Sequence, residues 1–555
     1  MPKPPLHSKS EQPKRWQLPP RLTKLWPTRR RYQILAVAGI VILVAALSVV
    51  NPGTRYVVIG KIVRHDTRVR ILDSATHRPV TEAVVNVSGH DYQTDAAGEV
   101  VIPKLGAGNH SVSVSKKYYN LIRPDIHVYI LKANATIEYQ IDALGTPVGI
   151  KILDAITAGA VAGAKVTVLN AEYTTNDLGE AFAIVPTARQ SETSSVSRDG
   201  FNSLSTTVKN SANPADNTIK LVPVGYVTYL SKRTGTINVY KADLDGSNAK
   251  VLVAGTGKEN DYDTQLMMSP DQKFVMLVAK REGQYSSLYR IDPTTGSIAY
   301  VDGKNGGVHI EGWVSDRLVY QQFTDKQLWE PAHTILKTYQ PATSRIITIA
   351  ESEGTGNSYN YVNSSFSSII VFQNQIIYGE NYYAPFSGNL RDKVTSLKSV
   401  LADGSNEKNL VEMPALDQKD NFTTTAVMAS IHNPSSLTLS FSSGDSTYYR
   451  YDGKTVTKIK PTDNVSSANF TLSYSPDGQK VMWSEPRDGT YTTFMADANG
   501  QNATQLATGS EQWVVSWLNS NYVLLQKDYK LYISSADMKS VPVKIADIHS
   551  ARFGY

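Results

Sequence analysis

The sequence contains no cysteine, and this absence excludes disulfide bonds, thiol catalysis and cysteine-ligated zinc or iron–sulfur sites. Catalytic signatures are absent as well: there is no Gly-x-Ser-x-Gly elbow, no His-Glu-x-x-His motif and no phosphate-binding loop. The ten histidines are scattered from His7 to His549 without the spacing of metal ligands. The sequence therefore predicts a protein that is not an enzyme and that needs neither a metal nor another cofactor.

Excess charge of one sign is absent from most of the chain. The formal net charge of the 555 residues is +6, but residues 1–31 carry nine Lys or Arg against a single acid, Glu11. The remaining residues are close to neutral, with 47 basic and 49 acidic side chains. Because no basic surface is indicated beyond the N-terminus, we expect no nucleic-acid partner.

A long apolar run occurs near the N-terminus. Ile34 to Val50 is interrupted only by Ala, Gly and Ser, and residues 32–50 are about long enough to cross a bilayer. Arg29, Arg30 and Arg31 precede the run, so a transmembrane helix would leave the N-terminus in the cytoplasm and the rest outside. A cleaved signal peptide and a twin-arginine export signal are the alternatives, but the run is longer than a usual signal sequence.

This reading predicts a single-pass protein of the bacterial cytoplasmic membrane, whose first partner is the lipid bilayer around residues 32–50. A cysteine-free extracytoplasmic chain is more typical of a bacterial envelope than of a eukaryotic secretory route. The basic tail, residues 1–31, contains seven prolines and is expected to be disordered.

An internal repeat follows a linker at residues 51–66. Residues 69–140 match residues 150–222, and the first stretch of the match has a constant offset of 81. The identities in this stretch are Ile71/Ile152, Asp73/Asp154, Ala83/Ala164, Tyr92/Tyr173, Thr94/Thr175, Gly98/Gly179 and Glu99/Glu180. Each copy alternates short strands with Asp/Asn-x-x-Gly turns, which predicts small antiparallel β-sandwiches at 67–142 and 147–223.

The order "ILD…AVVNV…YQTDAAGEVVIPKLGAGNHSVSVSKKYYN" resembles the carboxypeptidase regulatory-like domain. That resemblance implies an Ig-like or transthyretin-like sandwich that acts as a spacer or adhesive module and carries no peptidase activity. The second copy lacks the "LGAG" turn, so the resemblance is weaker there.

A second repeat occupies residues 224–555. The segment "SPDQKFVMLVAKREG" at 269–283 returns as "SPDGQKVMWSEPRDG" 206 residues later, and "KADLDGSNAKVLVAG" returns as "MADANGQNATQLATG" 254 residues later. Both spacings are multiples of about 51 residues, the length of one propeller blade. Ser-Pro-Asp before an apolar strand, and Asp-x-Asp-Gly between two strands, resemble the TolB-like propeller repeat, a relative of the WD-repeat blade.

The acidic residues of these motifs are interpreted as turn residues. Pro476 fixes φ, Asp477 accepts backbone hydrogen bonds and Gly478 takes a positive φ, which together reverse the chain between two strands. Counting such hairpins predicts seven four-stranded blades, with six or eight as the alternatives. The first blade lacks its own innermost strand, which we expect residues 551–555 to supply.

Aromatic residues in two inserted segments are the predicted ligand-binding residues: Trp329, Tyr382, Tyr383 and Phe386. Aromatics in insertions have no shared packing role, although they could instead cover the outer edge of a blade. Trp313 and Trp517 precede inner turns and are predicted to belong to blade cores.

The sequence thus predicts an all-β protein in which a transmembrane helix and two β-sandwiches carry a seven-bladed β-propeller. Its expected function is non-catalytic recognition of a protein or a glycan outside the membrane, as a binding or scaffold protein. Two alternatives remain: a propeller glycan hydrolase with carboxylates facing each other across the central pore, and a purely structural envelope component.

Overall fold

The structure is a computed structural model, and it describes most of the chain from residue 60 to residue 548. The described residues are 35–39, 42, 56, 60–130, 135–186, 190–372, 374–385, 393–414, 422–424, 428–431, 439–442, 448–459, 473–487, 490–498, 500–508, 513–527 and 529–548. From residue 60 onward they are nearly all β, with one short 3₁₀ helix, η1 (Pro214–Asn217), as the expected all-β class requires.

The predicted membrane segment lies mostly outside the described residues. Residues 35–39 and 42 are helical and exposed. Among the residues that the structure describes, no helix has the length and apolar character needed to cross a membrane.

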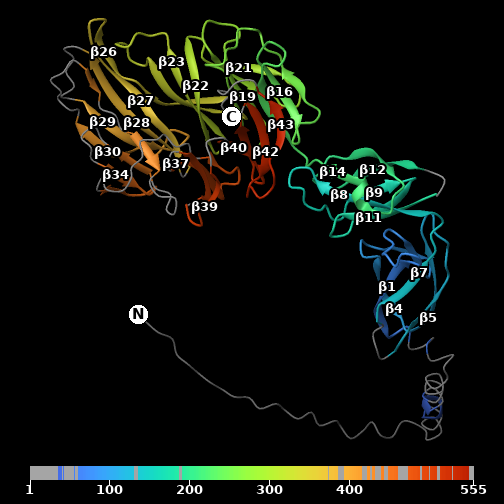
Figure 1. Cartoon of the computed structure of the whole chain (residues 1–555). Coiled ribbons are helices and arrows are strands. Elements are labelled where there is room, and N and C mark those ends of the chain that lie inside the picture. Colours follow the sequence, from blue (N-terminus) through green and yellow to red (C-terminus); the bar gives the residue numbers. More distant parts are fainter. Residues whose placement is uncertain are drawn as a thin grey trace, which may run out of the picture.

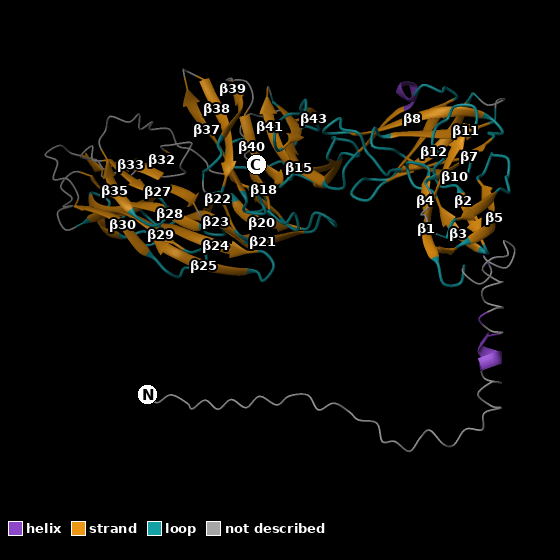
Figure 2. Ribbon diagram, turned by 90° about the horizontal axis from the view of Figure 1, so that it is seen from below, coloured by secondary structure: helices purple, strands orange, loops and turns teal. Residues whose placement is uncertain are grey.

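Two β-sandwiches with the same strand order follow the N-terminal region (Figures 1 and 2). The first sandwich pairs a sheet of β4 (Glu99–Gly106), β1 (Arg64–Asp73) and β7 (Ile137–Ile141) with a sheet of β3 (His90–Gln93), β2 (Val84–Val87), β5 (Gly108–Ser115) and β6 (Asp125–Val128). The second sandwich pairs β11 (Glu180–Val185), β8 (Thr146–Asp154) and β14 (Thr218–Leu221) with β10 (Ala171–Thr174), β9 (Lys165–Val168), β12 (Ser191–Ser197) and β13 (Leu204–Lys209).

The expectation of purely antiparallel sandwiches was wrong. β7 runs parallel to β1, and β14 runs parallel to β8 in the second copy. A parallel pair needs a long crossover connection instead of a tight turn, so no local turn signal marks it in the sequence.

Each sandwich contains a buried threonine at the same position of the repeat. Thr94 Oγ1 donates to the carbonyl of Val80 at 2.7 Å and accepts from the backbone N–H of Ala83 at 2.9 Å. At the offset of 81, Thr175 Oγ1 makes the equivalent bonds to Val161 (2.7 Å) and Ala164 (2.8 Å). A hydroxyl that satisfies two buried backbone groups explains why this residue type occurs in both copies.

Seven antiparallel sheets, numbered here in chain order, make up the described residues from Tyr226 to Asp547. The first three are β15 (Tyr226–Ser231), β16 (Asn238–Asp243) and β17 (Lys250–Val253); β18 (Gln265–Met268), β19 (Val275–Ala279), β20 (Ser287–Ile291) and β21 (Ile298–Asp302); and β22 (Gly306–Val314), β23 (Arg317–Thr324), β24 (Thr334–Gln340) and β25 (Arg345–Glu351). The fourth is β26 (Gly354–Asn357), β27 (Asn360–Phe372), β28 (Gln375–Pro385), β29 (Val394–Val400) and β30 (Lys408–Pro414), with β31 (Phe422–Thr424) also paired to β28.

The last three sheets have four strands each. They are β32 (Met428–Ile431), β33 (Leu439–Ser442), β34 (Tyr448–Tyr451) and β35 (Val456–Ile459); β36 (Ser473–Tyr474), β37 (Lys480–Arg487), β38 (Thr490–Asp497) and β39 (Thr504–Thr508); and β40 (Trp513–Asn519), β41 (Tyr522–Lys527), β42 (Lys530–Ser535) and β43 (Val543–Asp547). Only the first sheet has three strands among the described residues, which confirms that it starts without an innermost strand of its own.

The sheets are arranged radially, as in a β-propeller. Clusters of buried apolar side chains join the second sheet to the third and the third to the fourth. Another cluster joins the first sheet to the second and to the seventh. In that cluster, buried residues of β15 and β16 pack with Leu531, Ile533 and Ile545. The two ends of the series are therefore neighbours in space, and Figure 1 shows β16 of the first sheet beside β43 of the seventh.

Candidate functional site

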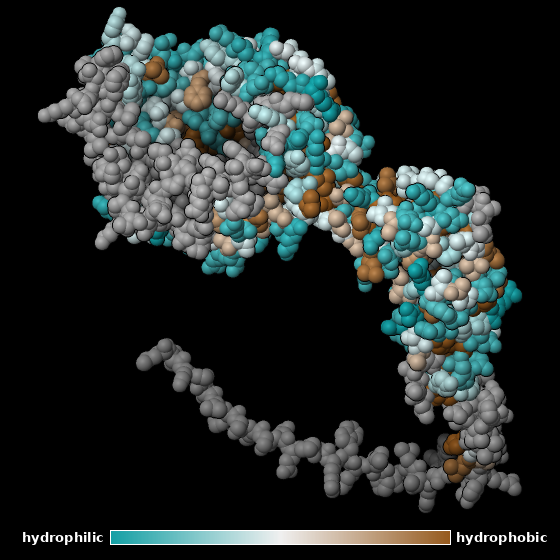
Figure 3. Space-filling view, in the orientation of Figure 1, coloured by the Kyte–Doolittle hydropathy of each residue, from teal (hydrophilic) through white to brown (hydrophobic). Residues whose placement is uncertain are grey.

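A large cavity lies where the seven sheets converge. Its volume is about 1620 Å³, and Figure 3 shows the propeller hollowed near its centre. Every sheet contributes to its wall; one lining residue from each, in chain order, is Thr228, Met268, Trp313, Val371, Asp452, Tyr474 and Trp517. The cavity is larger than a usual small-molecule pocket of about 300–1,000 Å³, so it has room for a segment of polypeptide or a comparably large ligand.

One wall of the cavity is formed by the turn between β36 and β37. The Ser475 hydroxyl donates to Asp477 Oδ1 at 2.6 Å, and the backbone N–H of Gln479 donates to the same oxygen at 3.0 Å. Gly478 has a φ of +66°, as predicted for this position. The hydrogen bond from Ser475, with that from Gln479, lowers the pKa of Asp477 below its usual value. Asp477 is therefore a turn residue that stays ionised at neutral pH.

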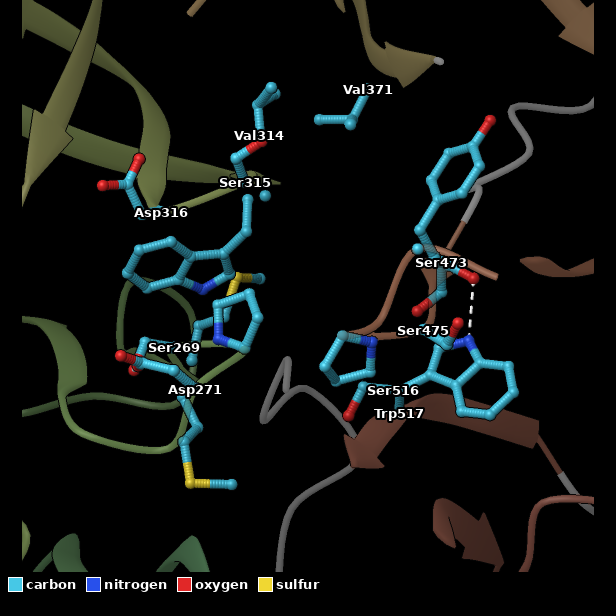
Figure 4. Close-up of a pocket in the computed structure, with 18 of the residues that line it drawn as sticks. Ser269, Asp271, Val314, Ser315, Asp316, Val371, Ser473, Ser475, Ser516 and Trp517 are labelled. Atoms are coloured by element: carbon cyan, nitrogen blue, oxygen red, sulfur yellow. Dashed lines mark hydrogen bonds between the residues drawn. The ribbon is translucent and has the colours of Figure 1, made fainter. Parts of the chain in front are cut away.

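The turn between β18 and β19 repeats this geometry on the facing wall (Figure 4). Ser269 Oγ donates to Asp271 Oδ1 at 2.7 Å, and the Lys273 N–H donates to it at 3.1 Å. Gln272 occupies the position of Gly478 with a φ of +58°. Burial raises the pKa of Asp271, but the hydrogen bonds from Ser269 and Lys273 outweigh it, so the pKa is lowered overall.

The charged lining of the cavity is mainly acidic. Among the described residues, five carboxylates line it, on Asp271, Glu311, Asp316, Asp452 and Asp477, against the ammonium groups of Lys273 and Lys454. Lys273 Nζ lies 3.2 Å from Asp271 Oδ2 in its own turn, so part of the positive charge is already compensated. The cavity therefore favours cationic over anionic ligands.

Glu311 reaches the cavity through a β-bulge in β22. Ile310 pairs with Tyr320 and Gly312 with Val319, so Glu311 is the extra residue between them. Gly312 has a φ of +147°, a conformation that favours glycine. Bulges change the direction of side chains and strengthen local twist, which accounts for the carboxylate of Glu311 facing the cavity at this point of the strand.

The Glu311 carboxylate has a neutral partner. Gln321 Nε2 donates to Glu311 Oε1 at 2.7 Å. Burial raises the pKa of Glu311, although this hydrogen bond and the nearby His309 act in the opposite direction. Among the described residues, no Lys or Arg side chain forms an ion pair with this carboxylate.

Two tryptophans at equivalent places line the cavity and also pack into the cores between sheets, where the sequence placed them. Trp517 Nε1 donates to the backbone carbonyl of Ser473 on the neighbouring sheet at 2.8 Å (Figure 4). Trp313 Nε1 is buried and has no hydrogen-bond partner in the part of the chain that the structure describes.

Trp329 and Tyr383, two of the predicted ligand-binding residues, lie in one row of rings. The Trp329 ring centroid is 6.1 Å from that of Tyr361, which is 6.2 Å from that of Tyr383. All three side chains are half-buried. The cavity is lined by the turns at Asp316, after β22, and at Asn374, after β27. Tyr361 and Tyr383 lie at the other end of the β27–β28 hairpin, so the row of rings is separate from the cavity.

Tyr382 has a different environment from Tyr383. It is 6% exposed and packs with Ala384 and Val362, because successive residues of β28 point to opposite faces. Its burial, with Glu380 and Glu353 nearby, raises the pKa of its phenol. Phe386, the fourth predicted residue, lies outside the described residues.

Tyr361 and Glu311 are functional candidates that the sequence did not reveal. Tyr361 precedes the part of β27 that was recognised as a hairpin, and nothing local marks it as a neighbour of Trp329. The dipeptide Glu311-Gly312 carried a usable signal, since a glycine inside a strand pattern often marks a bulge.

Metal binding finds no support in the described residues, where no group of three or more His, Asp and Glu side chains is placed to hold an ion.

No protein-family model matches the chain, and no curated protein sequence matches it. Similar solved structures include a prolyl endopeptidase (16% identity over 59% of this chain, TM-score 0.35), the β-propeller domain of the Trilobed protease from Pyrococcus furiosus (13% over 65%, 0.33) and a putative TolB from Agrobacterium tumefaciens (15% over 52%, 0.24). The matched regions cover 49%, 96% and 84% of those chains, so this chain spans about half the length of the prolyl endopeptidase. At these identities, none of the three assigns an activity or a ligand to this chain.

Proposed function

We propose that the chain is a non-catalytic binding protein whose propeller cavity receives a segment of a protein partner outside the membrane. The observation that carries this proposal is the cavity of about 1620 Å³ to which all seven sheets contribute. A site of this size buries more surface than a small metabolite offers, whereas an inserted loop or chain end would fill it.

The lining supports recognition of a polypeptide. Met267 and Met268 present flexible thioethers, which adapt to irregular apolar surfaces. Trp313, Tyr474 and Trp517 add aromatic surface, which contributes most of the energy in many protein interfaces. Ionised aspartates at the turns surround this apolar wall and would orient a partner by charge.

We also propose how the rest of the chain holds the cavity outside the membrane. Residues 32–50 anchor the chain in a bacterial cytoplasmic membrane, with the N-terminus in the cytoplasm. The two sandwiches, Ig-like in the resemblance of their sequence, act as spacers, and the seven sheets form one closed seven-bladed ring.

Filling the cavity tests the proposal. Val371 is half-buried in the cavity wall, so Val371→Trp would occupy space that a partner needs. Val251→Trp makes the same change on β17, where the side chain is 44% exposed and far from the lining. We expect the tagged full-length chain and its Val251→Trp variant to capture the same envelope protein by cross-linking, and Val371→Trp to lose it. Equal capture by both variants, with unchanged melting temperatures, would refute binding in the cavity.

A further inference from the structure

Among the described residues, the cavity carboxylate of Glu311 has no Lys or Arg partner, and this feature narrows the class of ligand that the cavity would bind. Glu311 is held by the bulge in β22, and its hydrogen bond from Gln321 comes from a neutral amide. Many other acids in the described part of the chain have a Lys or Arg nearby: Glu259 lies 3.0 Å from Arg281, and Asp302 lies 2.8 Å from Lys337. A half-buried carboxylate is stabilised most when an opposite charge approaches it.

Trp313, two residues after Glu311, offers a second group whose hydrogen bonding is unmet. Trp313 Nε1 has no acceptor within the described ranges, although the equivalent nitrogen of Trp517 donates to the carbonyl of Ser473. A buried N–H without a partner is unfavourable, and an incoming carbonyl oxygen would relieve it once the ring moves slightly. Glu311 and Trp313, two residues apart, thus give the cavity lining a carboxylate and a tryptophan whose buried N–H lacks an acceptor among the described residues.

The aromatic lining of the cavity affects whether an arginine or a lysine side chain of a ligand binds better. Trp313, Tyr474 and Trp517 all line the cavity. A guanidinium group stacks on aromatic rings and binds a carboxylate through two parallel hydrogen bonds, whereas an ammonium group does neither as well. The lining therefore suits arginine better than lysine.

Building on the proposed function, we propose that the cavity recognises a basic segment of its partner by seating an arginine side chain against Glu311, with a nearby backbone carbonyl of the segment accepting from Trp313 Nε1. The side chains of Asp271, Asp316 and Asp477 at the surrounding turns attract the segment by charge, while Glu311 selects the residue that enters.

A matched pair of peptides tests the cation seat. The probes are Ac-Gly-Tyr-Arg-Tyr-Gly-NH₂ and the same peptide with citrulline in place of arginine, which keeps the shape and removes the charge. Calorimetric titration of the full-length chain should give at least tenfold tighter binding of the arginine peptide. Glu311→Gln, which retains an acceptor for Gln321, should bring this ratio close to one, and Glu311→Asp should give an intermediate ratio.

Asp325→Asn is the control, because it removes one negative charge from an exposed residue that does not line the cavity. It should leave the ratio unchanged. Equal binding of the two peptides to the unmodified chain, binding of neither, or an unchanged ratio in Glu311→Gln would each overturn the arginine seat. If Val371→Trp still abolishes partner capture in that case, the proposed function stands and only the choice of ligand is wrong; if capture persists, the cavity is not the binding site.

Discussion

Single residues of the propeller combine packing with cavity lining, and the two equivalent tryptophans separate these roles. Trp313 and Trp517 occupy the same place before an inner turn, and both pack into apolar clusters between sheets. The Trp517 indole makes an intersheet hydrogen bond, whereas the Trp313 indole makes none to the described part of the chain. The same sequence position therefore contributes differently to stability in the two sheets.

Replacing each tryptophan by phenylalanine should reveal this difference. Both changes remove similar volume, but Trp517→Phe also removes a buried hydrogen bond and leaves the Ser473 carbonyl without its donor, at a cost of about 1 kcal/mol. Trp517→Phe should therefore lower the propeller's melting temperature by about 2 °C more than Trp313→Phe does. Differential scanning calorimetry of the two variants checks this. Equal shifts would show that the hydrogen bond adds no net stability.

At the scale of strands and turns, much of the propeller could be predicted because its turns have a chemical signature. Ser-Pro-Asp followed by a residue of positive φ reverses the chain in the same way at Asp271 and Asp477, and each predicted inner hairpin is present as a strand pair. The short strands β26 and β31 were missed because "GTGN" and "FTT" have weak strand patterns and form by pairing with the long β27–β28 hairpin.

The candidate site was less predictable than the fold, because local sequence patterns do not show which distant residues meet. A cavity between sheets collects residues from seven separate segments, and period and turn chemistry do not specify which side chains meet there. Glu311 appears in the sequence as one more polar residue of an edge-like strand, and only the observed register shows that it is the extra residue of a bulge. The ring row of Trp329 and Tyr383 likewise depends on Tyr361, whose place follows from strand pairing.

The junction between the two sandwiches is built from specific polar contacts. Lys116 Nζ donates to the carbonyl of Glu82 at 3.2 Å and to that of Glu172, and it lies 4.5 Å from the centre of the Tyr173 ring. The Thr174 N–H also donates to Thr81 Oγ1 across the junction, at 3.0 Å. Because Lys116 is enclosed at this junction, burial lowers its pKa to about 8, in spite of Glu82 and Glu172.

The lowered pKa predicts that the junction becomes more stable as the pH rises above 8. Lysine in the unfolded chain has a pKa of about 10.4, so between pH 8 and 10.4 the unfolded state binds more protons than the folded state. The free energy of unfolding then increases with pH, by at most about 1.4 kcal/mol per pH unit. Thermal melting of the sandwiches at pH 7.5 and 9.5 should show this increase. Lys116→Met should remove it; a variant with the same pH dependence as the parent would assign the effect to other groups.

For the whole molecule, the order of charge along the N-terminus predicts its orientation in a membrane. Arg29, Arg30 and Arg31 precede the apolar run of residues 32–50, so the sandwiches and the propeller should lie outside. Protease added to intact bacterial cells that express the chain should digest the propeller and spare an epitope tag at the N-terminus. Digestion in permeabilised cells provides the control. A propeller that is protected in intact cells and digested only after permeabilisation would contradict this topology.

The first and last sheets of the propeller are in contact with each other. Ser231 Oγ donates to the carbonyl of Asp547 at 3.0 Å, and β15 packs with residues of β41 to β43 in one apolar cluster. The first sheet has no strand inside β15 among the described residues, and β15 itself lines the cavity through Thr228. An unpaired strand edge at this point would promote association between molecules.

Residues 551–555 lie outside the described residues, and we expect them to pair with β15 as the innermost strand of the first sheet. Deleting them would remove ladder hydrogen bonds and the packing of Phe553 and Tyr555 at once, so the propeller should melt at a markedly lower temperature and form oligomers. Calorimetry and size-exclusion chromatography of the truncated chain measure the two effects, and replacing the same five residues by Gly-Ser-Gly-Ser-Gly keeps the length as a control. Because the segment would act through strand pairing and side-chain packing, the replacement should behave like the deletion. A truncated chain that stays monomeric and melts like the parent would mean that the propeller closes through the sheet contact at Ser231 and Asp547 alone.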